Sequence, residues 1–254
     1  MENLKVSSYY FSPTGGTRKV AEGFVKAFGE AAEEMDLGNK EPIGEEIKGD
    51  ILLAAAPVFG GRIPALVSEK LGKLNGTGKK AVSLAVYGTR AYEDALLELN
   101  EVLEKRGFQV IASGAFIAQH SMAPQVGEGR PDEKDMQEIK EFAEKVLEKL
   151  SRGEDSQVKV PGNHPYKPEM KVAAAPMSVQ GCTVCGACEK ACPTDAIKVE
   201  ENRVVTALEK CILCNACVKI CPQGARILPP PVQAHTQELL SPLKDVRREN
   251  EIFL

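Results

Sequence analysis

The sequence predicts a two-part protein: an α/β region built on a doubly wound parallel sheet, followed by a small cysteine-rich module. Strand-like and helix-like segments alternate over the first 150 residues. Four prolines interrupt that alternation between residues 151 and 176, and all eight cysteines follow within residues 182–221. We therefore expect an α/β domain at 1–150, a proline-rich linker at 151–176, a cysteine module at 177–231 and a short helix and tail at 232–254.

Five strand-like segments are spaced by helix-like ones in the first region. Residues 50–59 form a continuous apolar run, which is typical of a strand buried on both faces of a parallel sheet. Residues 131–150 repeat apolar side chains at helical spacing, which indicates an amphipathic helix. The expected strands are 4–11, 31–37, 50–59, 80–87 and 108–118, and the expected helices are 17–29, 64–74, 92–106 and 131–150.

Charge and hydropathy exclude some classes of function. The formal net charge of −4 is spread along the chain, and no segment forms the basic patch typical of nucleic-acid binding. No apolar run approaches the roughly 18 residues of a membrane span, and no charged leader precedes a long apolar stretch at the N-terminus. We expect a soluble, cytoplasmic protein without a nucleic-acid partner or a membrane span.

The cysteines form two copies of one pattern. In each copy three cysteines are spaced by two residues, and a fourth follows after three more residues and precedes a proline. Every cysteine recurs 29 residues later, so the module is an internal repeat. The two runs are Cys182, Cys185, Cys188 and Cys192 before Pro193, and Cys211, Cys214, Cys217 and Cys221 before Pro222.

This spacing favours two 4Fe–4S clusters over two structural zinc sites, which also take four thiolates, and over disulfides, which need an oxidising compartment. Three cysteines on a tight loop can reach three corners of one cubane, while the fourth points away and ligates the cluster of the other half. The first cluster would be held by Cys182, Cys185, Cys188 and Cys221, and the second by Cys211, Cys214, Cys217 and Cys192. The module resembles bacterial two-cluster ferredoxins, which implies a small α+β fold.

A loop after the first expected strand can hold a phosphate group. Its glycines let backbone N–H groups turn toward an anion, and the helix that follows favours negative charge at its N-terminus. The loop lacks the lysine of a nucleotide-triphosphate loop, and a plain capped turn is the alternative interpretation. Its residues are Ser12, Pro13, Thr14, Gly15, Gly16 and Thr17.

In position and residue types this loop resembles the FMN phosphate loop of flavodoxins. The resemblance implies a flavodoxin-like five-stranded sheet of order 2-1-3-4-5, an FMN cofactor and two loops flanking the flavin ring. Phe59, Tyr87 and Tyr92, the aromatic residues of these loops, are candidate stacking residues. The chain has no tryptophan, so the tryptophan stack of many flavodoxins is absent. His120 and Ser121 end the fifth strand and can approach the same place. The two flanking loops comprise Pro57, Val58, Phe59, Gly60 and Gly61, and Tyr87, Gly88, Thr89, Arg90 and Tyr92.

Together the two parts resemble flavodoxin–ferredoxin fusion proteins, which are electron carriers of anaerobes. The first hypothesis is an electron-transfer protein that passes electrons between FMN and two clusters, with unidentified redox proteins as donor and acceptor. An FMN-dependent reductase fed by its own clusters is the alternative; a redox-sensing regulator would need a DNA-binding motif, and the chain has none. The anionic cofactors favour a basic docking partner, and a homodimer is compatible with the sequence.

Overall fold

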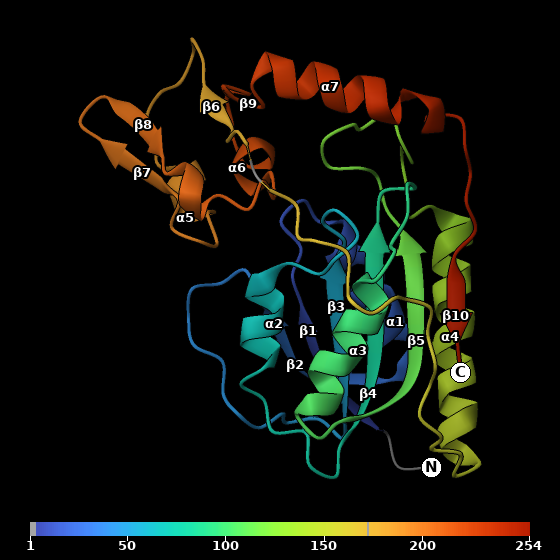
Figure 1. Cartoon of the computed structure of the whole chain (residues 1–254). Helices are drawn as coiled ribbons and strands as arrows, with labels where there is room; N and C mark the ends of the chain where they lie inside the picture. The colour runs from blue at the N-terminus through green and yellow to red at the C-terminus, as the bar shows by residue number, and fades with distance from the viewer. Residues whose placement is uncertain (1–3, 172) are drawn as a thin grey trace.

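The computed structural model describes residues 4–171 and 173–254 (Figure 1). Its central sheet has the strand order β2-β1-β3-β4-β5-β10, and the first five of these strands are parallel. This confirms the expected doubly wound sheet of order 2-1-3-4-5. The sheet strands are β1 (Lys5–Tyr10), β2 (Glu30–Asp36), β3 (Ile51–Pro57), β4 (Lys80–Tyr87), β5 (Gln109–Ile117) and β10 (Glu251–Phe253).

Helices cover both faces of the sheet. On one face, α1 (Gly16–Phe28) and α4 (Glu133–Ser151) share a buried cluster with β1, β3 and β5, in which the rings of Phe24 and Phe142 lie 5.5 Å apart. On the other face lie α2 (Ala65–Leu71) and α3 (Ala95–Lys105). Burial on both faces explains why β3 and β4 are almost entirely apolar.

Helix α3 begins later than the sequence pattern suggested. The expectation was residue 92, whereas the helix starts at Ala95, because Glu93 has a left-handed φ of 46°. The Asp94 carboxylate accepts hydrogen bonds from the backbone N–H groups of Asn163 (2.9 Å) and Lys167 (2.7 Å). The residue that precedes α3 therefore binds the backbone of the linker.

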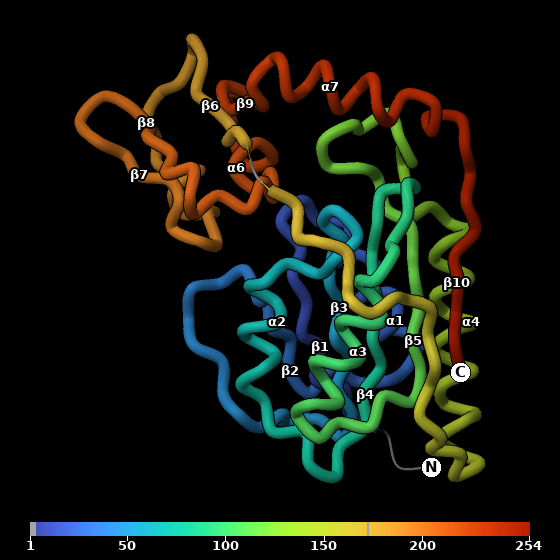
Figure 2. The backbone as a smooth tube through the Cα atoms, in the orientation of Figure 1, coloured from blue at the N-terminus to red at the C-terminus, as the bar shows by residue number. Residues whose placement is uncertain are grey.

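Residues 154–171 of the linker follow the surface of the α/β domain as an extended chain, which Figure 2 traces from the end of α4, past α3, toward the cysteine module. Val158 donates its N–H to the Val110 carbonyl at 3.0 Å. Arg62 donates to the Lys167 carbonyl at 2.7 Å and forms a largely buried ion pair with Glu98 at 2.7 Å. These contacts fix the linker against the domain and carry it toward the carboxyl ends of the strands.

The cysteine module contains two short helices and two small antiparallel sheets. Its second half packs on the α/β domain, because Cys214 and Ala216 share a buried cluster with Tyr9 and Phe11 of the first strand region. The pairs β6–β9 and β7–β8 form the small sheets. The elements are β6 (Met177–Ser178), α5 (Ala187–Lys190), β7 (Ile197–Glu200), β8 (Arg203–Thr206), α6 (Ala216–Lys219) and β9 (Arg226–Ile227).

The C-terminal tail returns to the α/β domain and adds a strand that the sequence analysis did not include. Helix α7 (Pro230–Leu240) crosses above the strand ends, and β10 then pairs antiparallel with β5 (Figure 1). Tyr92 donates its hydroxyl to Glu251 at 2.7 Å, and the Ile117 N–H donates to Asn250 at 2.9 Å. The tail thus covers a sheet edge that would otherwise be open.

Within the described residues, no helix is both long enough and apolar enough to cross a membrane.

Candidate functional site

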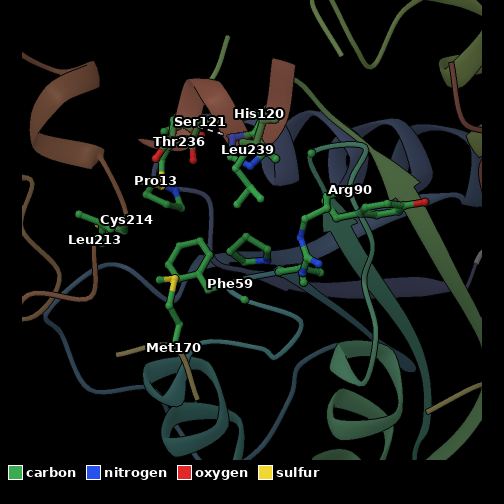
Figure 3. A pocket seen from close by; sticks show the side chains of 18 of the residues that line it. Pro13, Phe59, Arg90, His120, Ser121, Met170, Leu213, Cys214, Thr236 and Leu239 are labelled. Atoms are coloured by element: carbon green, nitrogen blue, oxygen red, sulfur yellow. Dashed lines mark hydrogen bonds between the residues drawn. The ribbon is translucent and has the colours of Figure 1, made fainter. Parts of the chain in front are cut away.

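A cavity of about 750 Å³ lies at the carboxyl ends of β1, β3 and β4. This is the edge at which doubly wound sheets bind ligands, and the volume falls within the range of small-molecule sites, roughly 300–1,000 Å³. The loops that follow these three strands form its floor (Figure 3). The structure therefore brings the three sequence-predicted loops to one place.

The first loop presents only part of its polar atoms to the cavity. Thr14, Gly16 and Thr17 line it, and among the described residues none accepts a hydrogen bond from the N–H groups of Gly16 and Thr17. Ser12 does not line the cavity, because its Oγ accepts the Arg18 N–H at 2.9 Å and completes the first turn of α1. Gly15 shapes the turn with a φ of 97°. The loop offers two hydroxyls and a helix N-terminus to an anion.

Gly16 lies against the residue that follows β5. A Cβ at position 16 would lie 2.8 Å from the Cβ of Ala118. The close approach of these two backbone segments therefore favours glycine at position 16.

In the second and third loops, too, only some of the predicted residues line the cavity. Pro57, Val58, Phe59 and Gly60 line the cavity, as do Tyr87, Gly88 and Arg90. Three predicted residues do not reach it. Gly61 packs against Glu93, where a Cβ would meet the carboxylate at 1.8 Å; Thr89 is fully buried; and the Tyr92 hydroxyl is bonded to Glu251. Of the three aromatic candidates, the structure brings Phe59 and Tyr87 to the cavity and leaves Tyr92 in the core beside Tyr87.

Segments that the sequence analysis did not assign to the site complete the walls. Met170 and Lys171 come from the linker, Thr236 and Leu239 from α7, and Leu213 from the cysteine module. Figure 3 places Leu213 and Cys214 on the side of the cavity opposite Arg90. No periodicity or motif marks these residues, because they come together only when the linker and tail fold back over the strand ends.

The lining carries more positive than negative charge. Arg90, Lys167 and Lys171 contribute to it, and no aspartate or glutamate among the described residues does. Arg90 and Lys167 share Glu93 as their ion-pair partner, at 2.9 and 2.8 Å. The excess of cations over this single carboxylate favours an anionic ligand.

His120 lies in the wall of the cavity as a neutral side chain. Burial, and to a lesser degree the charge of Arg90, lowers its pKa to about 4. Its Nδ1 accepts the Met122 N–H at 3.2 Å, so the proton of the neutral ring is on Nε2. His120 can therefore donate one hydrogen bond without placing a charge beside the ligand.

The cysteines surround two small cavities in the crossed combination that the spacing suggested. We call the first the outer cavity: it is lined by Cys182, Cys185, Cys188 and Cys221. Cys185 is exposed, and Cys182 and Cys221 are half-buried. Burial alone would raise the pKa of Cys221, but hydrogen bonds from backbone N–H groups of residues 223–226 outweigh it and lower the pKa. The outer cavity thus opens toward the surface.

The second set, which we call the inner cavity, is lined by Cys192, Cys211, Cys214 and Cys217. Burial raises the pKa of Cys214 to about 12, so its thiolate needs a cationic partner such as a metal. The Ala196 N–H donates to Cys192 Sγ at 3.2 Å, and the Leu213 N–H donates to Cys211 Sγ at 3.4 Å. Four thiols around one space, with N–H donors to sulfur, fit the requirements of an iron–sulfur cluster.

The inner cavity and the 750 Å³ cavity share a wall. Cys214 lines both, and Leu213, next to it in the chain, lines the larger one. The outer cavity shares no residue with the larger one. Cys188 of the outer set packs with Cys192 and Cys217 of the inner set in one buried cluster. The three cavities therefore lie in series: the large one, the inner cysteine cavity and the outer cysteine cavity.

Comparison with known proteins agrees with the cysteine module. Residues 181–225 match the family model described as a 4Fe-4S dicluster domain. This match confirms the resemblance to two-cluster ferredoxins. No curated protein matches the chain.

Among solved structures, the chain is similar to a flavodoxin from the domain Archaea, at 17% identity and a TM-score of 0.43, covering 58% of this chain and 99% of that one. It is also similar to oxidised flavodoxin 1 from Bacillus cereus, at 18% identity and a TM-score of 0.45, covering 57% and 97%. A third is the rubredoxin oxygen:oxidoreductase of the anaerobe Desulfovibrio gigas, at 16% identity and a TM-score of 0.44, covering 58% of this chain and 36% of that one.

Proposed function

We propose that this chain is an electron-transfer protein that binds FMN in the large cavity and one 4Fe–4S cluster in each cysteine cavity. Electrons would pass between the flavin and the surface by way of the inner and then the outer cluster. The observation that carries this proposal is the wall formed by Leu213 and Cys214, since Cys214 lines both the large cavity and the inner cysteine cavity.

The large cavity supports FMN through its floor and its charge. Thr14 and Thr17, with the N-terminus of α1, suit the phosphate, and Phe59 and Tyr87 suit the edge or face of an apolar ring. Lys171 and the pair Arg90 and Lys167 add positive charge for an anionic cofactor. Bound FMN would supply exchange between two-electron and one-electron chemistry.

The cysteine cavities support a directed path because their surroundings differ. The inner set lies against the α/β domain, where Cys214 is only 9% exposed. The outer set reaches the surface at Cys185, where a redox partner protein can dock. We infer that the outer cluster exchanges electrons with partners and that the inner cluster exchanges them with the flavin.

The roof of the large cavity favours a carrier over an FMN-dependent reductase. Thr236 and Leu239 of α7 line one side of the cavity, and Figure 3 places linker residue Met170 on the opposite side, beside Phe59, so protein side chains enclose the cavity from two sides. A reductase needs an open face for its substrate. The reductase would be favoured instead if a small molecule were reduced at the flavin faster than the outer cluster.

The first test is cofactor content after anaerobic purification. We expect one FMN with about eight iron and eight sulfide per chain, from two four-iron clusters. Stoichiometric zinc without sulfide would contradict the clusters, and the absence of flavin from protein supplied with FMN would contradict the large cavity's assignment.

The second test is rapid mixing of the loaded protein with a reductant that reacts at the flavin. If the cavities form one path, the clusters gain electrons at a rate that does not depend on protein concentration. A rate proportional to protein concentration would mean that flavin and clusters meet only between molecules.

A further inference from the structure

Arg226, the first residue of β9, is a buried cation in the cysteine module without a charged partner. It is only 2% exposed. Its Nη1 donates to Ser178 Oγ at 3.1 Å and its Nη2 donates to Thr206 Oγ1 at 2.6 Å, and both acceptors are neutral hydroxyls. Among the described residues, its Nε has no hydrogen-bond partner, and no carboxylate forms an ion pair with the guanidinium.

The internal repeat shows that the fold does not require an arginine at this place. The position 29 residues earlier is Ile197, which begins β7 and is 3% exposed. Both residues follow the same Cys-Pro-x-x-Ala sequence, as residues 192–196 and 221–225. An apolar side chain therefore fills the equivalent buried position in the first half.

Burying an unpaired guanidinium is costly, because the charge loses its hydration and gains no attraction to an opposite charge in return. The thiols are the nearby groups that can become negative. Arg226 lines the outer cavity together with Cys182, Cys185, Cys188 and Cys221. It is not among the residues that line the inner cavity.

We propose that Arg226 is a tuning residue that raises the reduction potentials of the two clusters, and of the outer cluster most. This inference rests on the proposed function. A four-iron cluster with a 2+ core and four thiolates carries a net charge of about −2, and reduction adds one electron, and so one negative charge. The electron comes from the flavin or from a partner protein. A fixed cation stabilises the more negative form more strongly, because the interaction energy scales with the product of the charges.

The test is a potentiometric titration of the loaded protein, followed by electron paramagnetic resonance of each reduced cluster. Arg226→Ile introduces the side chain found at the equivalent position of the first half, Ile197. Arg226→Lys keeps the positive charge but removes the planar guanidinium group. Arg203→Ile is the matched control, since Arg203 lies in the same module but is exposed and paired with Glu200.

In Arg226→Ile we expect the equilibrium of the outer cluster to shift toward the oxidised form by about tenfold, which is about 59 mV for one electron. The inner cluster should shift in the same direction by less. Arg226→Lys and Arg203→Ile should stay within about threefold of the parent protein, which is about half of that shift.

Full iron content with unchanged potentials in Arg226→Ile would overturn the inference while leaving the proposed function intact. If Arg226→Ile does not assemble clusters, Arg226→Lys decides the question. Assembly in the lysine variant supports a requirement for the charge, and failure there means that Arg226 is only structural. Absence of both clusters from the parent protein would refute the proposed function itself.

Discussion

The outer and inner cysteine cavities have the same four ligand types at the same spacing, yet they lie in different surroundings. The outer set includes an exposed cysteine and is lined by a buried arginine. The inner set is packed against the α/β domain and shares Cys214 with the large cavity. The repeat thus determines which atoms can bind iron, while the neighbouring domain determines which site lies nearer the flavin and which lies nearer the solvent.

The largest expected effect comes from a pair of cysteine variants taken from the same run. Cys192→Ser should remove the inner cluster, although Cys192 belongs to the first run, and Cys185→Ser should remove the outer one. We expect each variant to lose about four of eight iron atoms. Only Cys192→Ser should abolish rapid electron exchange with the flavin, whereas Cys185→Ser should abolish exchange with an external partner.

Iron analysis, cluster spectroscopy and rapid mixing measure these outcomes. Identical spectra for Cys192→Ser and Cys185→Ser would mean that each run of four binds its own cluster, and the crossed arrangement would then be wrong.

The next effect concerns the flavin end of the path. Thr14→Ala with Thr17→Ala should weaken FMN binding by roughly 1.5–3 kcal/mol for each lost hydrogen bond to the phosphate. The iron content of both cysteine cavities should stay the same. Ser12→Ala is the control within the same loop: its hydroxyl accepts the Arg18 N–H, so its loss should reduce stability by about 1 kcal/mol and leave FMN affinity nearly unchanged.

Fluorescence titration with FMN and urea unfolding separate the two kinds of loss. Equal FMN affinities in the double variant and the parent protein would identify the loop as a turn without a binding role.

A smaller effect is expected from acid, because His120 at the flavin end is held neutral in the folded protein, whereas the outer cysteine cavity opens toward the surface. The folded state holds the pKa of His120 at about 4, below its ordinary value near 6.5. Between these two values the unfolded chain binds more protons than the folded one, so stability falls as the pH is lowered from 6.5 to 4. The loss attributable to His120 is roughly 3 kcal/mol and levels off below pH 4.

Replacement of His120 by asparagine should remove that part of the acid sensitivity. Urea unfolding of the parent protein and the variant at pH 7 and at pH 4 measures the difference. An equal loss of stability in both proteins would show that His120 is already solvated in the folded state.

Several features were predictable because they depend on local pattern. Alternating apolar segments give the five parallel strands and their helices, and the strand order follows from the resemblance of the loop at residues 12–17. The crossed sets of cysteines also follow from spacing. Three cysteines of each run can face one site, while the fourth points toward the site of the other half. In contrast, Ser12, Gly61, Thr89 and Tyr92 have suitable residue types but face the helix, the core or the tail.

The residue chemistry follows from the amino-acid order: which cysteines are available in which spacing, which glycines permit the turns, and which segments prefer strand or helix. What those residues face depends on how the whole chain folds. The linker and the tail carry no periodic signal, yet they place Met170 and Leu239 over the strand ends and set β10 on the edge of β5. The same folding brings Leu213 and Cys214 to the large cavity and leaves Arg226 buried among neutral partners. Periodicity and spacing report interactions over a few residues, whereas these contacts join segments that are far apart in the chain, such as residues 13 and 239. Their energy depends on burial that exists only in the folded chain.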